Sequence, residues 1–172
     1  MQNQVEEAGN LFLKLIETDQ DLTQFYSMPL SIRLGVYATF EDGIREISRR
    51  RQRKKLNSLE LLGKKAYELL KSQLAKELQG KIKQLYQLQL DEDVVYKEYL
   101  RDKTSEAKMK FKVACKKVRR STQELWQYPI SVQKAACGLL AGEVAQANSI
   151  LYIQKGRVAQ MEEEERKVKQ IY

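Results

Sequence analysis

The scarcity of helix-breaking residues constrains the fold of this chain more than any other feature. Two prolines, Pro29 and Pro129, and eight glycines are spread over 172 residues. Long stretches without such residues favour long helices over many short strands. Apolar residues also recur at the three- and four-residue spacing of a helix along most of the chain. We therefore predict an all-α fold, a helical bundle of four to five helices with at least one long helix.

Three helical segments are predicted in the first half of the chain. An amphipathic helix spans about 5–22, and Pro29 suits the first turn of a long second helical region. Within that region the pair Asn57–Ser58 offers a break, with Ser58 as the N-cap of the segment that follows. The apolar face of this following segment is predicted to consist of Leu59, Leu62, Ala66, Leu70, Leu74, Leu78, Ile82 and Leu85.

Two further helix starts are predicted in the second half. The acidic triplet 91–93 predicts one of them, because carboxylates are favoured near the unpaired N–H groups of a helix N-terminus. Tyr128 and Pro129 end this helix, since the residue before a proline avoids the α region. A last helix runs from about Ile130 to near the end of the chain. The apolar face of the helix before it is predicted to include Ala107, Phe111, Cys115, Val118, Thr122 and Leu125.

The length of the chain, with 42% hydrophobic and 31% charged residues, fits a single all-α domain, 1–172, with an apolar core. Cys115 and Cys137 lie in apolar helical patterns, so we predict two small buried residues and neither a disulfide framework nor a zinc site. The most apolar stretch, 130–153, contains Lys134 and Glu143, which argues against a membrane-spanning helix. No secretory leader is visible, and we expect a cytoplasmic protein.

The surroundings of the two prolines resemble each other at an offset of 100 residues. The segment FYSMPLSI around Pro29 matches the segment LWQYPISV around Pro129 in character, and a weaker similarity extends over 22–48 and 122–148. Two interpretations are open. The chain contains an internal duplication, or two segments use the same helix-start chemistry independently.

Small residues form a strip along the predicted last helix. Glycine inside a helix costs up to about 1 kcal/mol relative to alanine, so several on one face imply close packing. We predict that this C-terminal helix is central and packed on two sides, with Ser31, Gly35 and Ala38 as a matching strip on the second helical region. A contact between protomers is the competing use. The strip consists of Ala135, Gly138, Gly142, Ala145 and Ser149.

The charge balance is basic, with 31 Lys and Arg against 23 Asp and Glu and a net charge of +8. Such an excess favours an anionic partner. A first basic cluster is dense and repels itself unless it is neutralised, and the nearest acids in sequence are Glu46 and Glu60. This first cluster consists of Arg45, Arg49, Arg50, Arg51, Arg53, Lys54 and Lys55.

A second basic cluster follows a predicted helix. Lys108, Lys112, Lys116 and Arg120 recur every four residues, with Lys117 and Arg119 beside them. At about 1.5 Å of rise per residue this row spans roughly 18 Å, a length suited to following a phosphate backbone. A solvated polar face, on which lysine stems cover apolar neighbours, is the alternative interpretation.

The chain contains no histidine, the commonest general base and metal ligand, and no glycine-rich phosphate loop. We therefore expect a non-enzymatic protein without a metal or a cofactor. Neither basic cluster has interleaved aromatic residues for base stacking, so contact with RNA or DNA backbone is the better fit. The predicted function is nucleic-acid-backbone binding, for example as an accessory subunit of a larger complex. The alternatives are a membrane-surface protein and a protein scaffold or homo-oligomer.

Overall fold

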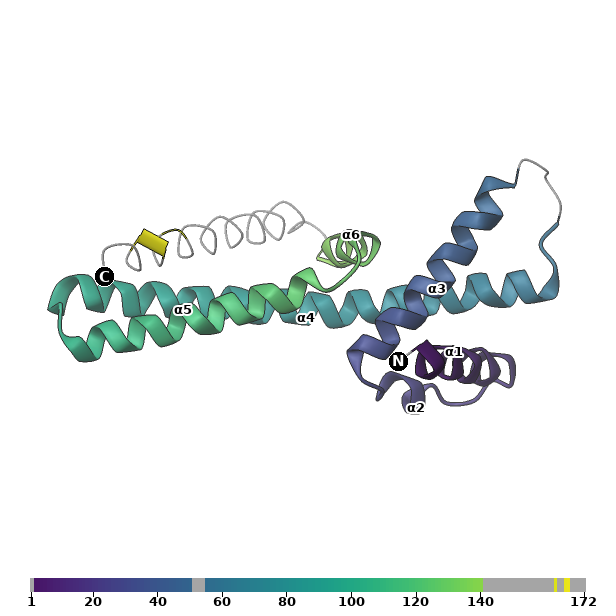
Figure 1. Cartoon of the computed structure of the whole chain (residues 1–172), viewed down its shortest axis with the longest axis horizontal. Helices are drawn as coiled ribbons and strands as arrows, with labels where there is room; N and C mark the ends of the chain where they lie inside the picture. Colours follow the sequence, from purple (N-terminus) through teal and green to yellow (C-terminus); the bar gives the residue numbers. More distant parts are fainter. Residues whose placement is uncertain (1, 51–54, 141–162, 164–165, 168–172) are drawn as a thin grey trace. The chain divides into compact units, whose positions relative to one another are not determined.

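The computed structural model shows an all-α chain with one long helix (Figure 1). The structure describes residues 2–50, 55–140, 163 and 166–167. Five of the helices in these residues correspond to the five predicted segments, and the four-residue α2 is the addition. The described helices are α1 (Gln2–Glu17), α2 (Thr23–Tyr26), α3 (Leu30–Arg49), α4 (Ser58–Asp102), α5 (Ser105–Trp126) and α6 (Ile130–Leu139).

The chain divides into two compact units, and the boundary between them falls inside α4. The first unit, Met1–Leu74, contains α1, α2, α3 and the first turns of α4. The second unit begins at Ala75 and contains the rest of α4 with α5 and α6. The single-domain organisation expected for 1–172 stays a prediction.

In the first unit α1 packs closely on α3. Phe12 and Phe25 are fully buried, and their rings stack with centroids 4.2 Å apart. A Cβ atom on Gly35 would lie 2.7 Å from Cγ2 of Val5, so the missing side chain lets the two helices approach. The predicted use of Gly35 against the last helix was therefore wrong, because α1 occupies that surface. The other two residues of the predicted strip, Ser31 and Ala38, are exposed.

The boundaries of the first two helical elements also differ from the prediction. α1 ends at Glu17, five residues before the expected end, and Asp19 adopts a positive φ of 54°. The side chain of Asp21 then accepts hydrogen bonds from the backbone N–H and the hydroxyl of Thr23. These bonds satisfy a backbone donor at the start of α2, a short helix that the sequence did not predict.

The predicted break before the long helix is confirmed, but the N-cap of this helix is Asn57 and not the predicted Ser58. The side-chain oxygen of Asn57 accepts a hydrogen bond from the backbone N–H of Glu60 at 2.8 Å. Asn57 is therefore the N-cap of α4, and Ser58 is its first helical residue. Leu59 is 71% exposed and does not belong to the core, whereas the rest of the predicted face from Ala66 to Leu85 is buried.

The helix start predicted at 91–93 was wrong, because α4 continues through this acidic triplet to Asp102. Leu85, Leu88 and Val95 keep the helical apolar spacing across it. Asp91 accepts a hydrogen bond from the side chain of Gln87 one turn earlier. The carboxylates are thus accommodated inside a helix, and no proline or glycine interrupts the chain there.

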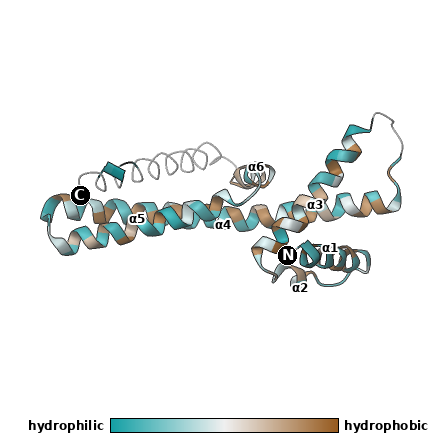
Figure 2. Cartoon of the chain, in the orientation of Figure 1, coloured by the Kyte–Doolittle hydropathy of each residue, from teal (hydrophilic) through white to brown (hydrophobic). Residues whose placement is uncertain are grey.

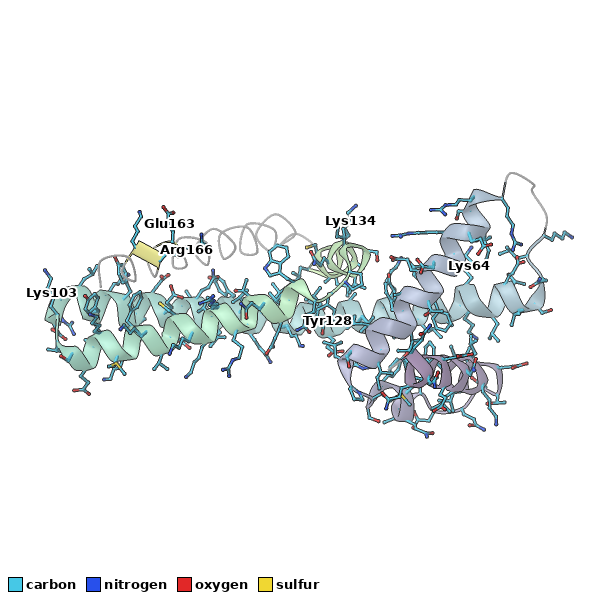
Figure 3. The ribbon with its side chains drawn as sticks, viewed as in Figure 1. Lys64, Lys103, Tyr128, Lys134, Glu163 and Arg166 are labelled. Atoms are coloured by element: carbon cyan, nitrogen blue, oxygen red, sulfur yellow. The ribbon has the colours of Figure 1, made fainter. Side chains whose placement is uncertain are left out.

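The actual break is a two-residue turn, Lys103–Thr104, which reverses the chain into α5. Lys103, at the end of the hairpin in Figure 3, has a φ of 48°. The hydroxyl oxygen of Thr104 accepts a hydrogen bond from the N–H of Ala107 and caps α5. The ring of Phe111 lies 5.1 Å from that of Tyr96 and 6.0 Å from that of Tyr99. These contacts show that α4 and α5 pack side by side.

The predicted apolar face of α5 is confirmed. Cys115, Val118, Thr122 and Leu125 are all buried, while hydrophilic residues alternate with them along the helix (Figure 2). Cys115 and Cys137 are both buried, as predicted. Among the described helices, none is long and apolar enough to cross a membrane.

The two proline corners share their local structure. Pro29 precedes α3 and Pro129 precedes α6, with φ and ψ of −53° and 145° in one and −59° and 154° in the other. Arg33 donates from Nε to the carbonyl of Met28, and Gln133 donates from Nε2 to the carbonyl of Tyr128, both at 2.9 Å. The resemblance seen in the sequence is therefore a resemblance in hydrogen bonding as well. Duplication and independent use of one corner both remain compatible with it.

Candidate nucleic-acid interface

The first basic cluster is partly neutralised where the structure describes it. Arg45 pairs with Glu41, one turn earlier in α3, at 3.0 Å. Arg50, just after α3, pairs at 3.0 Å with Glu60 in the first turn of α4. Both pairs leave the arginine largely exposed, so each contributes little stability. They nevertheless lower the positive charge that this cluster presents.

The remaining members of the first cluster divide into two groups. Arg49 and Lys55 are exposed and form no ion pair within the described residues. Arg51, Arg53 and Lys54 lie outside the described residues, so their predicted role stays a prediction. Of the two acids nearest in sequence, Glu60 forms one of these pairs. Glu41 forms the other, because it lies four residues from Arg45 on the same helical face.

The second basic cluster lies on the outer face of α5. Lys108, Lys112, Lys116 and Arg120 are all exposed, and so is Lys117. None of these five side chains forms an ion pair within the described parts of the chain. The segment 108–120, KMKFKVACKKVRR, contains seven basic residues and no acid. Lys108, Lys112, Lys116 and Arg120, with Lys117 beside them, therefore form an exposed cationic surface without ion pairs to the described residues.

Burial of the opposite face holds this cationic surface in place. Cys115 and Val118 are buried, and the hydroxyl of Thr122 donates to the carbonyl of Val118 at 2.8 Å. With one face of α5 fixed, the four-residue spacing of the row aligns its side chains on the other. Arg119 is half-buried and already takes part in an interaction, and its predicted role in nucleic-acid binding stays a prediction. Lys110 pairs with Glu106 at 3.7 Å.

The small-residue strip is described only at its start. Ala135 is half-buried, and Gly138 is exposed with no atom within 4 Å of the place where a Cβ would stand. No helix of the described chain therefore packs on Gly138. Gly142, Ala145 and Ser149 lie outside the described residues. The packing of this strip, in the chain or between protomers, stays a prediction.

The sequence analysis missed a groove between α4 and α5, with a volume of about 460 Å³. The predicted helix start at 91–93 divides the part of α4 that lines this groove, so the sequence did not predict one continuous helix there. Its signal in the sequence is Met109 and Val113, two apolar residues outside the predicted apolar face of α5. The groove is lined by Leu88, Asp91, Val95, Glu106, Met109, Lys110, Val113, Ala114 and Lys117.

Three or more His, Cys, Asp or Glu side chains do not come together as metal ligands anywhere in the described residues. Comparison of the chain with protein-family models, curated proteins and solved structures found no significant match.

Proposed function

We propose that this protein is a non-enzymatic accessory protein that binds the sugar–phosphate backbone of a nucleic-acid duplex through α5. The observation that carries the proposal is the row Lys108, Lys112, Lys116 and Arg120, exposed along one helix and free of ion pairs with described residues. Such a row keeps its full charge for an external anion. Each contact with a phosphate releases condensed counterions, and this release drives the binding.

The dimensions of the row fit a duplex backbone. Over its length of roughly 18 Å, at about 1.5 Å per residue, one strand of a duplex presents about five phosphates at roughly 3.4 Å of rise each. Flexible lysine stems on a rigid helix can follow this spacing without reading the bases. The absence of an exposed aromatic side chain in 108–120 argues against stacking on a single strand.

The row on α5 is a better candidate for the primary nucleic-acid contact than the first basic cluster. The first cluster was the stronger candidate in the sequence because of its density. Two of its three described arginines, Arg45 and Arg50, are engaged by Glu41 and Glu60, whereas the row on α5 has no such partners in the described residues. We therefore assign the primary contact to α5 and a supporting contact to Arg49 and Lys55.

The proposal is tested by fluorescence anisotropy with labelled RNA and DNA duplexes of about 20 base pairs, over a salt series. Four phosphate contacts predict that log K falls with log salt with a slope of about −3.6. The double variant K112E/K116E is expected to reduce the slope by about 2 and to weaken binding at least tenfold at low salt. The matched control K83E/K97E makes the same charge change at two exposed lysines of α4.

The control is expected to lose much less affinity than the α5 variant, because its lysines lie outside the row. Equal losses in the two variants would show that only net charge matters and would overturn the assignment to α5. If the protein does not bind nucleic acid at low salt but binds vesicles of acidic phospholipid, the proposed partner is wrong and a membrane surface takes its place. Circular dichroism checks that both variants keep their helix content.

A further inference from the structure

The groove between α4 and α5 is an apolar surface within the second unit. Leu88 and Val95 line it from α4, and Met109, Val113 and Ala114 line it from α5. Met109 is 59% exposed and Val113 is 49% exposed. These side chains are therefore not covered by the packing of the two helices on each other.

Two further apolar side chains of α4 are exposed outside the groove, on a different side of the helix. Leu90 is 42% exposed and Val94 is 58% exposed, and each directly precedes a residue that lines the groove, Asp91 or Val95. Such isolated exposed apolar residues are ordinary on protein surfaces, but exposed apolar side chains gathered in one groove, as Met109 and Val113 are, point to a binding partner.

The charges of the groove differ from those of the adjoining row. Asp91 and Glu106 face it together with Lys110 and Lys117, so its acids and lysines balance. A nucleic acid or an acidic membrane would therefore find no excess of positive charge there to attract it. A surface with both signs of charge around an apolar centre is suited to another protein.

We propose that the groove binds a second copy of this chain, with the two α5 helices antiparallel across a two-fold axis. The α5 residues that line it occupy positions 106, 109, 110, 113, 114 and 117, a pattern symmetric about the midpoint between Phe111 and Lys112. A two-fold contact pairs each position with its mirror position in the other copy. Glu106 then lies opposite Lys117 of the partner subunit, and Met109 lies opposite Ala114 of the partner subunit.

This pairing is complementary in charge at Glu106 and Lys117 and in size at Met109 and Ala114, while Lys110 lies opposite Val113 of the partner subunit with its ammonium free to reach solvent. The Glu–Lys pair occurs twice, once at each end of the contact, because the symmetry repeats it. Between the ends, a long apolar side chain meets a small one, as interdigitated helix packing requires. A parallel arrangement with each position facing itself would oppose Glu106 to Glu106 and Lys117 to Lys117, and is disfavoured by repulsion. Only groove residues take part in this contact, so dimerisation is independent of nucleic-acid binding.

The test is sedimentation equilibrium of the full-length protein without nucleic acid, with the variants E106K and K117E. Wild type is expected to dimerise, and each single variant is expected to raise the dimer Kd at least tenfold, because two like-charge pairs replace two attractive ones. An equimolar mixture of E106K and K117E restores both opposite-charge pairs in the mixed dimer. The mixture is therefore expected to form heterodimers with an affinity close to that of the wild type.

The mixture also separates a lost interface from a lost fold, since an unfolded variant would not recover on mixing. The control K112E changes the same charge on α5 outside the groove and is expected to dimerise like wild type. M109E, which places a carboxylate among the apolar groove residues, is expected to be monomeric. A monomeric wild type, or a dimer that neither E106K nor K117E weakens, would refute the proposal and leave the groove to a different partner.

Discussion

The hydroxyl of Tyr37 in α3 donates a hydrogen bond to the hydroxyl oxygen of Tyr67 in α4 at 3.2 Å, and the two rings stack with centroids 5.3 Å apart. Tyr67 in turn donates to Glu41 at 3.4 Å, and the ammonium of Lys71 lies 5.1 Å from its ring. Both tyrosines are buried. Tyr67 thus combines apolar burial with polar contacts to two residues of α3.

Replacing Tyr67 with phenylalanine should keep the stacked rings and remove both hydrogen bonds. We expect a loss of about 1–2 kcal/mol in the free energy of unfolding, because buried polar partners lose a bond that water cannot replace. Tyr26→Phe is the control, since Tyr26 packs on Phe12 and forms no side-chain hydrogen bond within the described residues. Chemical denaturation measures both. Equal stability of Tyr67→Phe and wild type would show that the hydroxyl contacts are not important.

The close approach of α1 and α3 at Gly35 predicts a cost for adding a single methyl group. Gly35→Ala is expected to destabilise the first unit by about 1–3 kcal/mol, because Val5 must move away from the new Cβ. Gly43→Ala in the same helix meets no atom within 4 Å and should stabilise by about 0.5–1 kcal/mol. The double variant V5A/G35A should recover part of the loss. Equal melting temperatures for Gly35→Ala and Gly43→Ala would contradict the close packing of α1 on α3 at Gly35.

The capping bond from Ala107 to Thr104 predicts that the start of α5 depends on one hydroxyl. Thr104→Ala should cost about 1 kcal/mol, because the N–H of Ala107 loses its acceptor at a helix start. Thr39→Ala is the matched control. The hydroxyl of Thr39 donates to the carbonyl of Gly35 inside α3, and its loss should cost little. Urea denaturation that shows the same loss for both variants would argue against the cap.

Burial raises the pKa of the Cys137 thiol. The neutral thiol is favoured in the folded chain, so its contribution to stability is present below the unfolded pKa of about 8.5 and is lost as the pH rises through the folded pKa. Native Cys137 should therefore react slowly with iodoacetamide at pH 8 and rapidly in denaturant. Cys137→Ala should flatten the fall in stability above pH 8. Alkylation of the native thiol as fast as that of a free cysteine would contradict its burial.

The sequence predicts the helical class, the proline corners and most of the buried faces, because these depend on local spacing. It misplaces the start of α5, since carboxylates suit both a helix N-terminus and, as at Asp91, a helix interior with a polar neighbour one turn away. It also misses the pairing of Arg50 with Glu60, which depends on how the chain connects α3 to α4.

One part of the candidate site can be predicted from the sequence and another part cannot. The row on α5 is visible in the sequence because four-residue spacing alone aligns its members on one helical face. The groove is not visible, because it exists only where α4 and α5 pack together. Met109 and Val113 give the one local signal for it, as apolar residues among lysines.

The two-residue turn at Lys103–Thr104 also has a consequence for the order of folding. The contacts of Phe111 with Tyr96 and Tyr99 join residues only 12 to 15 positions apart, so few chain segments must be ordered before they form. Local contacts of this kind close fast and lower the entropic barrier to folding. The α4–α5 hairpin is therefore expected to form early, and a chain emerging from the ribosome would have this pair of helices as a nucleus before its last residues are made.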